Sequence, residues 1–375
     1  IYYPKKATSQ NANQGAAFSA HVEITPVNVN SSVINAPNGW YEAKEGTLLA
    51  SLRDSNTLKT PITTPGAAVS TADEALLASA EDDNGTSYYF RGAVTNNYVE
   101  FANKCWRIVR VGGDGSVKLI LHNDNTAGAT NPCDSVNNST SAAFARYSGT
   151  TYKSAFNEKY DDNAYVGFMY GTAGAADYAT THANTNKSTM LTNLEAWYNN
   201  NLSDYADKIV DTVWCNDKTN VTDTSYNPLS KYGITPSGLG YAKNVTYYGA
   251  TQRLVSTSDS AGGTGPSLKC NGELSKINSK VGLITADELA YAGYARRIQN
   301  TTTYLQENAT DTSWWSLSPS DFRGSSPFGW AVGGGKGGFD SDYVVDTHGV
   351  RPSISLKSST NVTGEGTSDK PFVVD

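Results

Sequence analysis

Hydrophobic and polar positions alternate most regularly between residues 105 and 122. "CWRIVRV" and "VKLILH" place apolar side chains at about every second position, and "GGDGS" separates the two runs. A period of two is the period of a strand, and a short turn rich in glycine and aspartate joins such strands into a hairpin. The pattern predicts an antiparallel hairpin, and we expect the folded core to begin shortly before it, near residue 87.

Two segments follow the helical period instead. From Ser188 to Ile209 apolar residues recur at steps of three and four, with Ser188 or the next residue as the N-cap. In "GLITADELAYAG", Thr285 and Glu288 have the spacing of a capping box, and Gly293 offers a helix stop. The sequence therefore predicts two helices, each with one face on the core.

The rest of the pattern predicts strands and loops. "VRPSISL" alternates as a last strand, in which Pro352 indicates an edge or a bulge. Residues 125 to 187 are long, irregular and rich in glycine and asparagine, which is typical of functional loops. We expect residues 1–85 to form an N-terminal stalk or a small β-rich or extended segment with a linker. Residues 86–375 are then one α+β domain with two helices, short twisted antiparallel strands and long loops.

Composition and charge narrow the partners and the location. Charged residues make up 17% of the chain and the net charge is −7, with no Lys/Arg cluster longer than two, so nucleic acid is excluded as a ligand. No apolar run reaches the roughly 18 residues that a membrane span needs. The chain begins with Ile rather than Met. We expect a processed or truncated extracellular protein, whose membrane or cell-wall anchor lies outside the numbered chain.

The four cysteines are spaced far apart. No CxxC pair occurs, which argues against zinc and thioredoxin-like sites. Two disulfides allow three connectivities, of which Cys105 with Cys133 and Cys215 with Cys270 closes the shorter loops. Four buried thiols are the alternative.

Candidate catalytic groups do not assemble into a motif. The four histidines lie in unrelated contexts, and His182, in a polar loop, is better explained by structural hydrogen bonding than by catalysis. In "VGGGKGG", Lys336 is followed by glycine and then by a non-helical segment, unlike a phosphate-binding loop. These glycines indicate backbone freedom or little demand for side-chain volume. We expect no enzyme activity, no cofactor and no metal site.

Three motifs near the C-terminus carry a resemblance to a known fold. "VGLITADELAYAG", "WWSLSPS" and "GVRPSISL", in this order, resemble the closing section of the C-type lectin fold, in the version shared with formylglycine-generating enzymes. Together with "YYFRGAVTNNYVEFANKCWRIVRV" they resemble the variable proteins of diversity-generating retroelements, found on the cell surfaces of gut bacteria. The resemblance covers residue 87 to the end. It implies a C-type lectin-like fold and a surface-displayed receptor or adhesin that binds an unknown protein or glycan.

In that family, error-prone copying at template adenines rewrites the 3′ end of the gene, which implies massive sequence variation. An AAC or AAT codon changed only at adenine yields many residue types but never Trp, Lys, Glu or a stop. The resemblance places the variable region at about residues 314–356. Fourteen of the residues there that such codons can yield form the expected ligand-binding face: Asp321, Arg323, Ser325, Ser326, Phe328, Gly333, Gly335, Asp340, Ser341, Asp342, Tyr343, Val345, Asp346 and His348. The expected framework of that face is Trp314, Trp315, Trp330, Val344, Gly349 and Arg351. Lys336 departs from the codon rule.

The expected face has the chemistry of a protein-binding surface, because aromatic residues supply contact area and small polar residues supply adaptable hydrogen bonds. We expect its side chains to point outward, so that they change without unfolding the domain. Three alternatives stay open. A fixed-specificity, calcium-dependent lectin lacks its E-P-N, Q-P-D and W-N-D signatures here, and an oxidase of the formylglycine-generating type lacks cysteines after Cys270. A structural envelope protein is the third.

Overall fold

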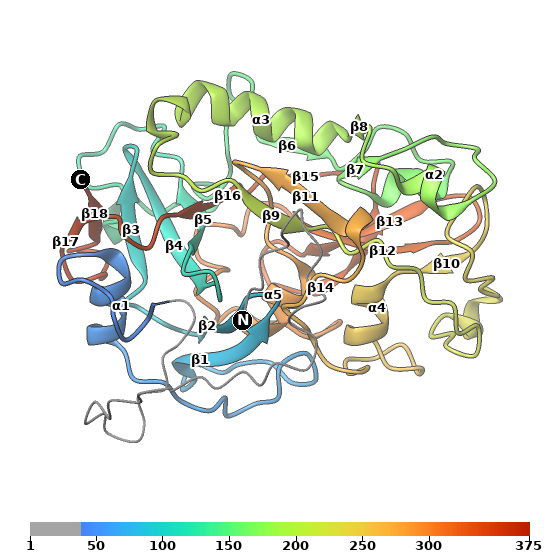
Figure 1. Cartoon of the computed structure of the whole chain (residues 1–375), viewed down its shortest axis with the longest axis horizontal. Coiled ribbons are helices and arrows are strands. Elements are labelled where there is room, and N and C mark those ends of the chain that lie inside the picture. The colour runs from blue at the N-terminus through green and yellow to red at the C-terminus, as the bar shows by residue number, and fades with distance from the viewer. Residues whose placement is uncertain (1–38) are drawn as a thin grey trace, which may run out of the picture. The chain divides into compact units, whose positions relative to one another are not determined.

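Two main sheets carry the described part of the chain, residues 39 to 375, in the computed structural model (Figure 1). The α-helices among these residues are α1 (Leu48–Ser55), α2 (Tyr178–His182), α3 (Thr189–Asn201), α4 (Gly249–Leu254) and α5 (Ala286–Ala292). The strands are β1 (Ala75–Asp82), β2 (Gly85–Gly92), β3 (Tyr98–Phe101), β4 (Lys104–Val111), β5 (Val117–Asn123), β6 (Lys153–Ala155), β7 (Met169–Tyr170), β8 (Asn186–Lys187), β9 (Thr212–Cys215), β10 (Thr246–Tyr247), β11 (Lys276–Ser279), β12 (Trp314–Phe322), β13 (Pro327–Val332), β14 (Phe339–Tyr343), β15 (Thr347–Gly349), β16 (Ser353–Leu356), β17 (Val362–Thr363) and β18 (Phe372–Val374). The mixed α+β class predicted from the sequence is confirmed.

The first sheet contains the predicted hairpin. β4 and β5 pair antiparallel, and the eight-stranded sheet runs β1-β2-β4-β3-β18-β17, with β5 joining β4 to β16. Both strands are buried on both faces. Their polar side chains are tolerated there because they have polar partners in the interior. Arg107, for example, donates from Nε to Asn97 Oδ1 at 2.7 Å. β16 pairs only with β5 among the named strands, and Pro352 lies just before it. On its other side β16 makes single bridges, Ser353 to Gly282 and Leu356 to Ile209, so β16 is an edge among the named strands but its outer side is not free.

The second sheet holds most of the expected ligand-binding stretch. Its six strands run β14-β13-β12-β15-β6, with β10 on the far end of β12. β12 and β13 pair antiparallel with irregular register after Trp315, and β13 pairs with β14 without a break. β12 meets β15 in parallel at Trp314 and Gly349. β14 is thus the outermost strand of this sheet.

Both predicted helices are present. α5 begins at Thr285 with the capping box complete, since Glu288 N–H donates to Thr285 Oγ1 at 3.0 Å and Thr285 N–H donates to Glu288 Oε2 at 2.9 Å. α3 begins after Ser188 and runs above β6 (Figure 1), but it ends at Asn201, earlier than the apolar spacing indicates. Three consecutive asparagines at the end of this helix favour turns over helix, which explains the early end. Among the described residues, α1, α2 and α4 were not predicted.

Only part of the expected N-terminal segment, residues 39–85, lies within the described residues. Residues 1–38 of the expected stalk or β-rich segment lie outside the described residues. The expected boundary at residue 85 falls at the first residue of β2, which pairs with β1 along its whole length. Residues 39–85 therefore belong to the same compact unit as residues 86–375, because their apolar side chains pack in the common core. No helix in the described part is long and apolar enough to cross a membrane.

Two disulfides close the shorter loops, as favoured from the spacing. Cys105 is bonded to Cys133, which ties β4 to the loop after β5. Cys215 is bonded to Cys270 at the end of β9. Cystines of this kind persist in oxidising compartments.

Candidate functional site

The expected framework residues form the buried layer beneath the candidate face. Trp314, Trp315 and Trp330 are fully buried, and Val344 lies in the same core. Gly349 has no room for a side chain, since a Cβ there would lie 2.5 Å from the Phe144 ring. The last framework residue, an arginine at position 351, is also buried. These side chains fix the positions of β12, β13 and β15.

The expected variable residues occupy three levels of exposure. Ser325, Gly335, Tyr343 and Asp346 are exposed. Seven are partly exposed: Arg323, Ser326, Gly333, Asp340, Ser341, Asp342 and Val345. Asp321, Phe328 and His348 are buried, at 2%, 3% and 8% exposure. The expectation that these three point outward is wrong, because each is covered by neighbouring side chains.

Phe328 is the middle layer of an aromatic stack. Its ring centroid lies 4.3 Å from that of Tyr343, its cross-strand partner on β14. On β12's side, the Arg323 guanidinium lies 3.5 Å from the Phe328 centroid. Tyr343 is 46% exposed and forms the outer end of the stack. Two other residues of the expected face thus contact the Phe328 ring directly.

Asp321 is held at the end of β12 by polar contacts. The Ser320 hydroxyl donates to Oδ1 at 2.7 Å, and Arg323 pairs with Oδ2 through Nε. Arg323 reaches further to Ser341 Oγ, 3.2 Å from its Nη2. One arginine therefore connects β12, β13 and β14 across the candidate face.

A second polar cluster consists of Asp342 on β14, Asp346 and His348. His348 Nε2 is 3.1 Å from Asp342 Oδ2, and the imidazole packs against Trp315 at 4.4 Å between centroids. The hydrogen bond from His348 lowers the pKa of Asp342. Desolvation, and then the charge of Asp342, raise the pKa of Asp346. Two carboxyl groups and one imidazole are thus electrostatically linked at this end of the face.

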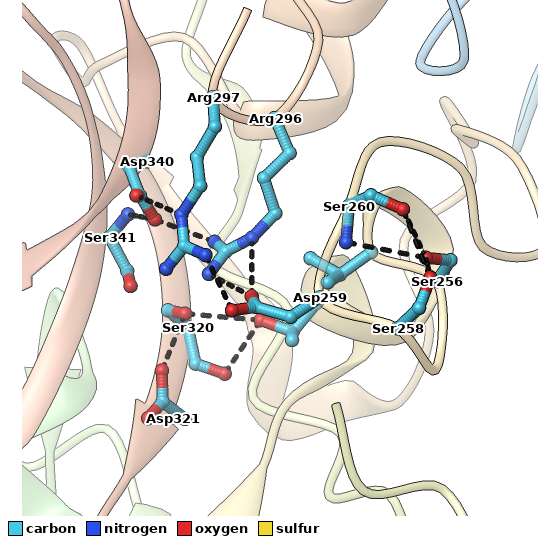
Figure 2. A network of polar contacts seen from close by, with 12 residues as sticks. Ser256, Ser258, Asp259, Ser260, Arg296, Arg297, Ser320, Asp321, Asp340 and Ser341 are labelled. Atoms are coloured by element: carbon cyan, nitrogen blue, oxygen red, sulfur yellow. Dashed lines mark hydrogen bonds and ion pairs between the residues drawn. The ribbon is translucent and has the colours of Figure 1, made fainter. Parts of the chain in front are cut away.

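Figure 2 shows an ion-pair network that continues the face beyond the predicted stretch. Asp259, fully buried, accepts from Arg296 Nε at 3.0 Å and Nη2 at 2.7 Å, and also pairs with Arg297. Lys231 Nζ lies 3.2 Å from Asp259 Oδ2. Asp340 on β14 bridges both arginines. Sequence reasoning missed these four partners of the expected face, because residues 231, 259 and 296 to 297 lie far apart in the chain and follow no motif.

The connection between β13 and β14 constrains its glycines more than expected. Gly335 and Gly337 both have φ of +63°, which favours glycine. A Cβ at Gly337 would lie 2.2 Å from the Asn300 carbonyl oxygen, and one at Gly334 would lie 2.8 Å from Thr312 backbone. The interpretation of little side-chain demand is therefore wrong for Gly334 and Gly337. Lys336 is exposed between them.

The described surface also has hollows, of which two contain charged or hydroxyl side chains next to the elements of the face. A groove of about 410 Å³ beside Gly335 is lined by hydroxyl and carboxyl groups, among them Thr302, Thr303 and Glu307. A cleft of about 220 Å³ is lined by charged residues of β1, β4, β5 and α5. Within it, Glu288 Oε1 accepts from Lys118 at 2.6 Å and from Arg110 at 2.8 Å.

The histidine singled out from the sequence is buried. His182 Nε2 lies 2.7 Å from the Gly240 carbonyl oxygen and 3.3 Å from the Tyr248 hydroxyl. Burial, with a contribution from the Lys218 charge, lowers its pKa to about 3. The imidazole is therefore neutral at physiological pH and makes structural hydrogen bonds. Among residues 39 to 375, no group of three or more His, Cys, Asp or Glu side chains is arranged to hold a metal ion.

Comparison of the chain with protein-family models, with curated proteins and with solved structures finds no match. The geometry of the site therefore carries the functional inference.

Proposed function

We propose that the protein is an extracellular, surface-displayed receptor or adhesin that binds a protein or glycan through the end of the second sheet. The face comprises the outward positions of residues 321 to 348 on β12, β13, β14 and their connections. We further propose that the fold is C-type lectin-like and that adenine-directed mutagenesis diversifies this face.

One observation carries the proposal, namely the separation of the face into a buried framework and an accessible variable set. All six expected framework residues are buried, whereas all but three of the fourteen expected variable residues are at least partly exposed. Phe328, which is buried, contacts Arg323 and Tyr343, and these two belong to the same expected variable set. Substitutions at the eleven accessible positions therefore change mostly contacts at the surface and leave the core intact.

The chemistry of the accessible set supports binding. Tyr343 offers a large ring that is held in place by Phe328, so little conformational entropy is lost when a ligand covers it. Ser325 and Ser326 lie in the β12–β13 turn and supply small hydrogen-bonding groups. A rigid aromatic anchor with polar surroundings is typical of binding hot spots. Both disulfides are compatible with an extracellular location.

The gene itself provides the test of diversification. We expect a near-copy of the DNA encoding residues 314 to 356 downstream of the stop codon, near a reverse transcriptase gene. The two copies should differ almost wholly at template adenines. Population sequencing should place missense changes in the expected variable positions. Changes spread evenly over the whole gene, or an identical stretch in every cell, would overturn this part of the proposal.

Binding is tested with panels of glycans and of extracellular proteins. The reagents are the wild-type chain, the variant Tyr343→Ala and the control Tyr160→Ala, which removes a tyrosine of similar exposure (54% against 46%) outside the face. For a ligand bound by the wild type, we expect Tyr343→Ala to weaken binding at least 30-fold, or about 2 kcal/mol, as at other aromatic hot spots. Equal affinity of both variants for the ligand would show that Tyr343 is not part of the binding surface. Loss of binding on calcium chelation would indicate the fixed-specificity lectin instead.

A further inference from the structure

Arg296 and Arg297 present their guanidinium groups side by side at the edge of β14 (Figure 2). The carboxylate of Asp340 lies across both, with Oδ1 2.6 Å from Arg296 Nη1 and Oδ2 2.8 Å from Arg297 Nε. The Asp340 side chain is 40% exposed, so solvent reaches this point. Two cations that grip the two oxygens of one carboxylate make a defined receptor for that group.

The receptor is held by residues other than Asp340. Asp259 is fully buried and accepts hydrogen bonds from both arginines. The backbone N–H of Arg297 donates to the Phe339 carbonyl at 2.8 Å, which fixes the arginine at the strand edge. The Arg296 guanidinium lies 5.5 Å from the Trp330 ring, and its side chain is only 3% exposed. The guanidinium groups therefore stay in place when the side chain at position 340 changes.

Charge explains why an anion is needed there. Three cations, Lys231, Arg296 and Arg297, meet two carboxylates, those of Asp259 and Asp340. Without the carboxylate at position 340, Asp259 alone faces the three cations. A partly buried excess of positive charge is costly unless an anion neutralises it.

We propose that Arg296 and Arg297 form a constant carboxylate-binding site within the ligand-binding face, which Asp340 fills in this chain. In forms of the protein with a small neutral residue at position 340, a carboxylate of the ligand occupies the site. The site deepens the proposed function and rests on it for its biological use, because position 340 belongs to the set expected to vary. The carboxylate can come from a sugar acid or from an acidic side chain.

The experiment uses acetate as the probe. We expect the variant Asp340→Ala to have a lower melting temperature than the wild type. At about 0.1 M, sodium acetate should raise it by about 2 °C more than sodium chloride of equal ionic strength, since a ligand bound only to the folded state stabilises it. The wild type should show no difference between the two salts. A crystal structure of the variant grown in acetate should place the anion between the two guanidinium groups.

Two further variants keep the test decisive. In Asp340→Ala/Arg297→Ala the acetate effect should disappear, because one half of the receptor is gone. Asp340→Ser replaces Asp340→Ala if the latter does not fold. Equal melting temperatures in acetate and chloride for the folded single variant would overturn the proposal, as would an equal acetate effect in the double variant.

Larger carboxylates distinguish the two sources of the group. Glucuronate represents a sugar acid, and N-acetylglutamate amide represents an acidic side chain. The compound that stabilises Asp340→Ala at the lower concentration identifies the source, and stabilisation by neither overturns the ligand assignment. None of these measurements depends on sequence variation in the gene. The carboxylate-binding site can therefore be overturned while the proposal of a diversified receptor stands. The receptor proposal can likewise be overturned while the site stands.

Discussion

Phe328 and Tyr343 face each other across β13 and β14, yet they play opposite roles. Phe328 is 3% exposed between Tyr343 and the Arg323 guanidinium, whereas Tyr343 is 46% exposed. Truncating a buried aromatic ring leaves a cavity, and truncating an exposed ring does not. The two residues are equally reachable from an asparagine codon, but only one of them is free to change at low cost to folding.

This difference predicts separate outcomes for two single substitutions. Phe328→Ser should lower the free energy of unfolding by about 3 kcal/mol, whereas Tyr343→Ser should change it by less than about 1 kcal/mol. Urea denaturation followed by tryptophan fluorescence measures both. A loss below about 1 kcal/mol for Phe328→Ser would mean that its neighbours collapse into the vacated space.

At the scale of elements, the β13–β14 connection combines positions that are expected to vary with positions that the backbone constrains. Gly335 and Gly337 share the left-handed backbone conformation, but only Gly337 also approaches another backbone segment. At Gly335 an added Cβ meets nothing within 4 Å. Asparagine tolerates the left-handed conformation better than other residues with a Cβ. An asparagine codon at position 335 is therefore compatible with the fold.

A matched set of glycine substitutions tests this distinction. Gly337→Ala should cost at least about 2 kcal/mol of unfolding free energy, from backbone strain and from displacement of the Asn300 carbonyl. Gly335→Asn should cost less than about 1 kcal/mol. Gly338→Ala is the control, since its φ is not positive and its Cβ would meet nothing within 4 Å. Thermal and urea unfolding give the order, and equal losses at positions 335 and 337 would contradict it.

At the scale of the whole molecule, the charged cleft links four elements through one carboxylate. Glu288 on α5 pairs with Lys118 on β5 and Arg110 on β4, and Arg110 pairs with Asp82 on β1 at 2.9 Å. Burial alone would raise the pKa of Glu288, but the charges of Lys118 and Arg110 outweigh it and hold the pKa at about 2. These ion pairs thereby tie α5, which contacts β12 of the second sheet, to three strands of the first sheet.

The lowered pKa of Glu288 predicts acid sensitivity. Its folded-state pKa of about 2 lies below the ordinary value of 4.5. The ion pairs therefore stabilise the fold fully above pH of about 4.5, and this contribution is lost as the pH falls toward 2. The shift corresponds to roughly 3 kcal/mol.

We expect Glu288→Gln to be less stable than the wild type at pH 7 and to lose roughly 3 kcal/mol less between pH 5 and pH 2. Glu273→Gln, at a side chain that is 88% exposed, is the control. Urea unfolding across this pH range measures the difference. Parallel pH profiles for Glu288→Gln and the wild type would contradict the assignment.

The sequence by itself determined those features that depend on local order along the chain. The β4–β5 hairpin follows from alternation around a turn, and the N-terminus of α5 follows from the spacing of Thr285 and Glu288. For the two disulfides, the cost of closing loops favoured the observed pairing among three possible ones. The burial of Trp314 and Trp330 follows from their size and apolar character. In each case the information lies within one segment or in one residue type.

Only the tertiary structure decided which polar and aromatic residues meet. The short helices α1 and α4 have too few turns for a helical period to stand out, and tertiary packing stabilises them. The burial of Phe328 depends on the register of β13 with β14. The carboxylate-binding pair at Arg296 and Arg297 depends on Asp259, 37 residues earlier in the chain from Arg296. Contacts between distant segments arise when the chain closes on itself, and a linear pattern of hydrophobic and polar residues does not encode which partners then lie within hydrogen-bonding distance.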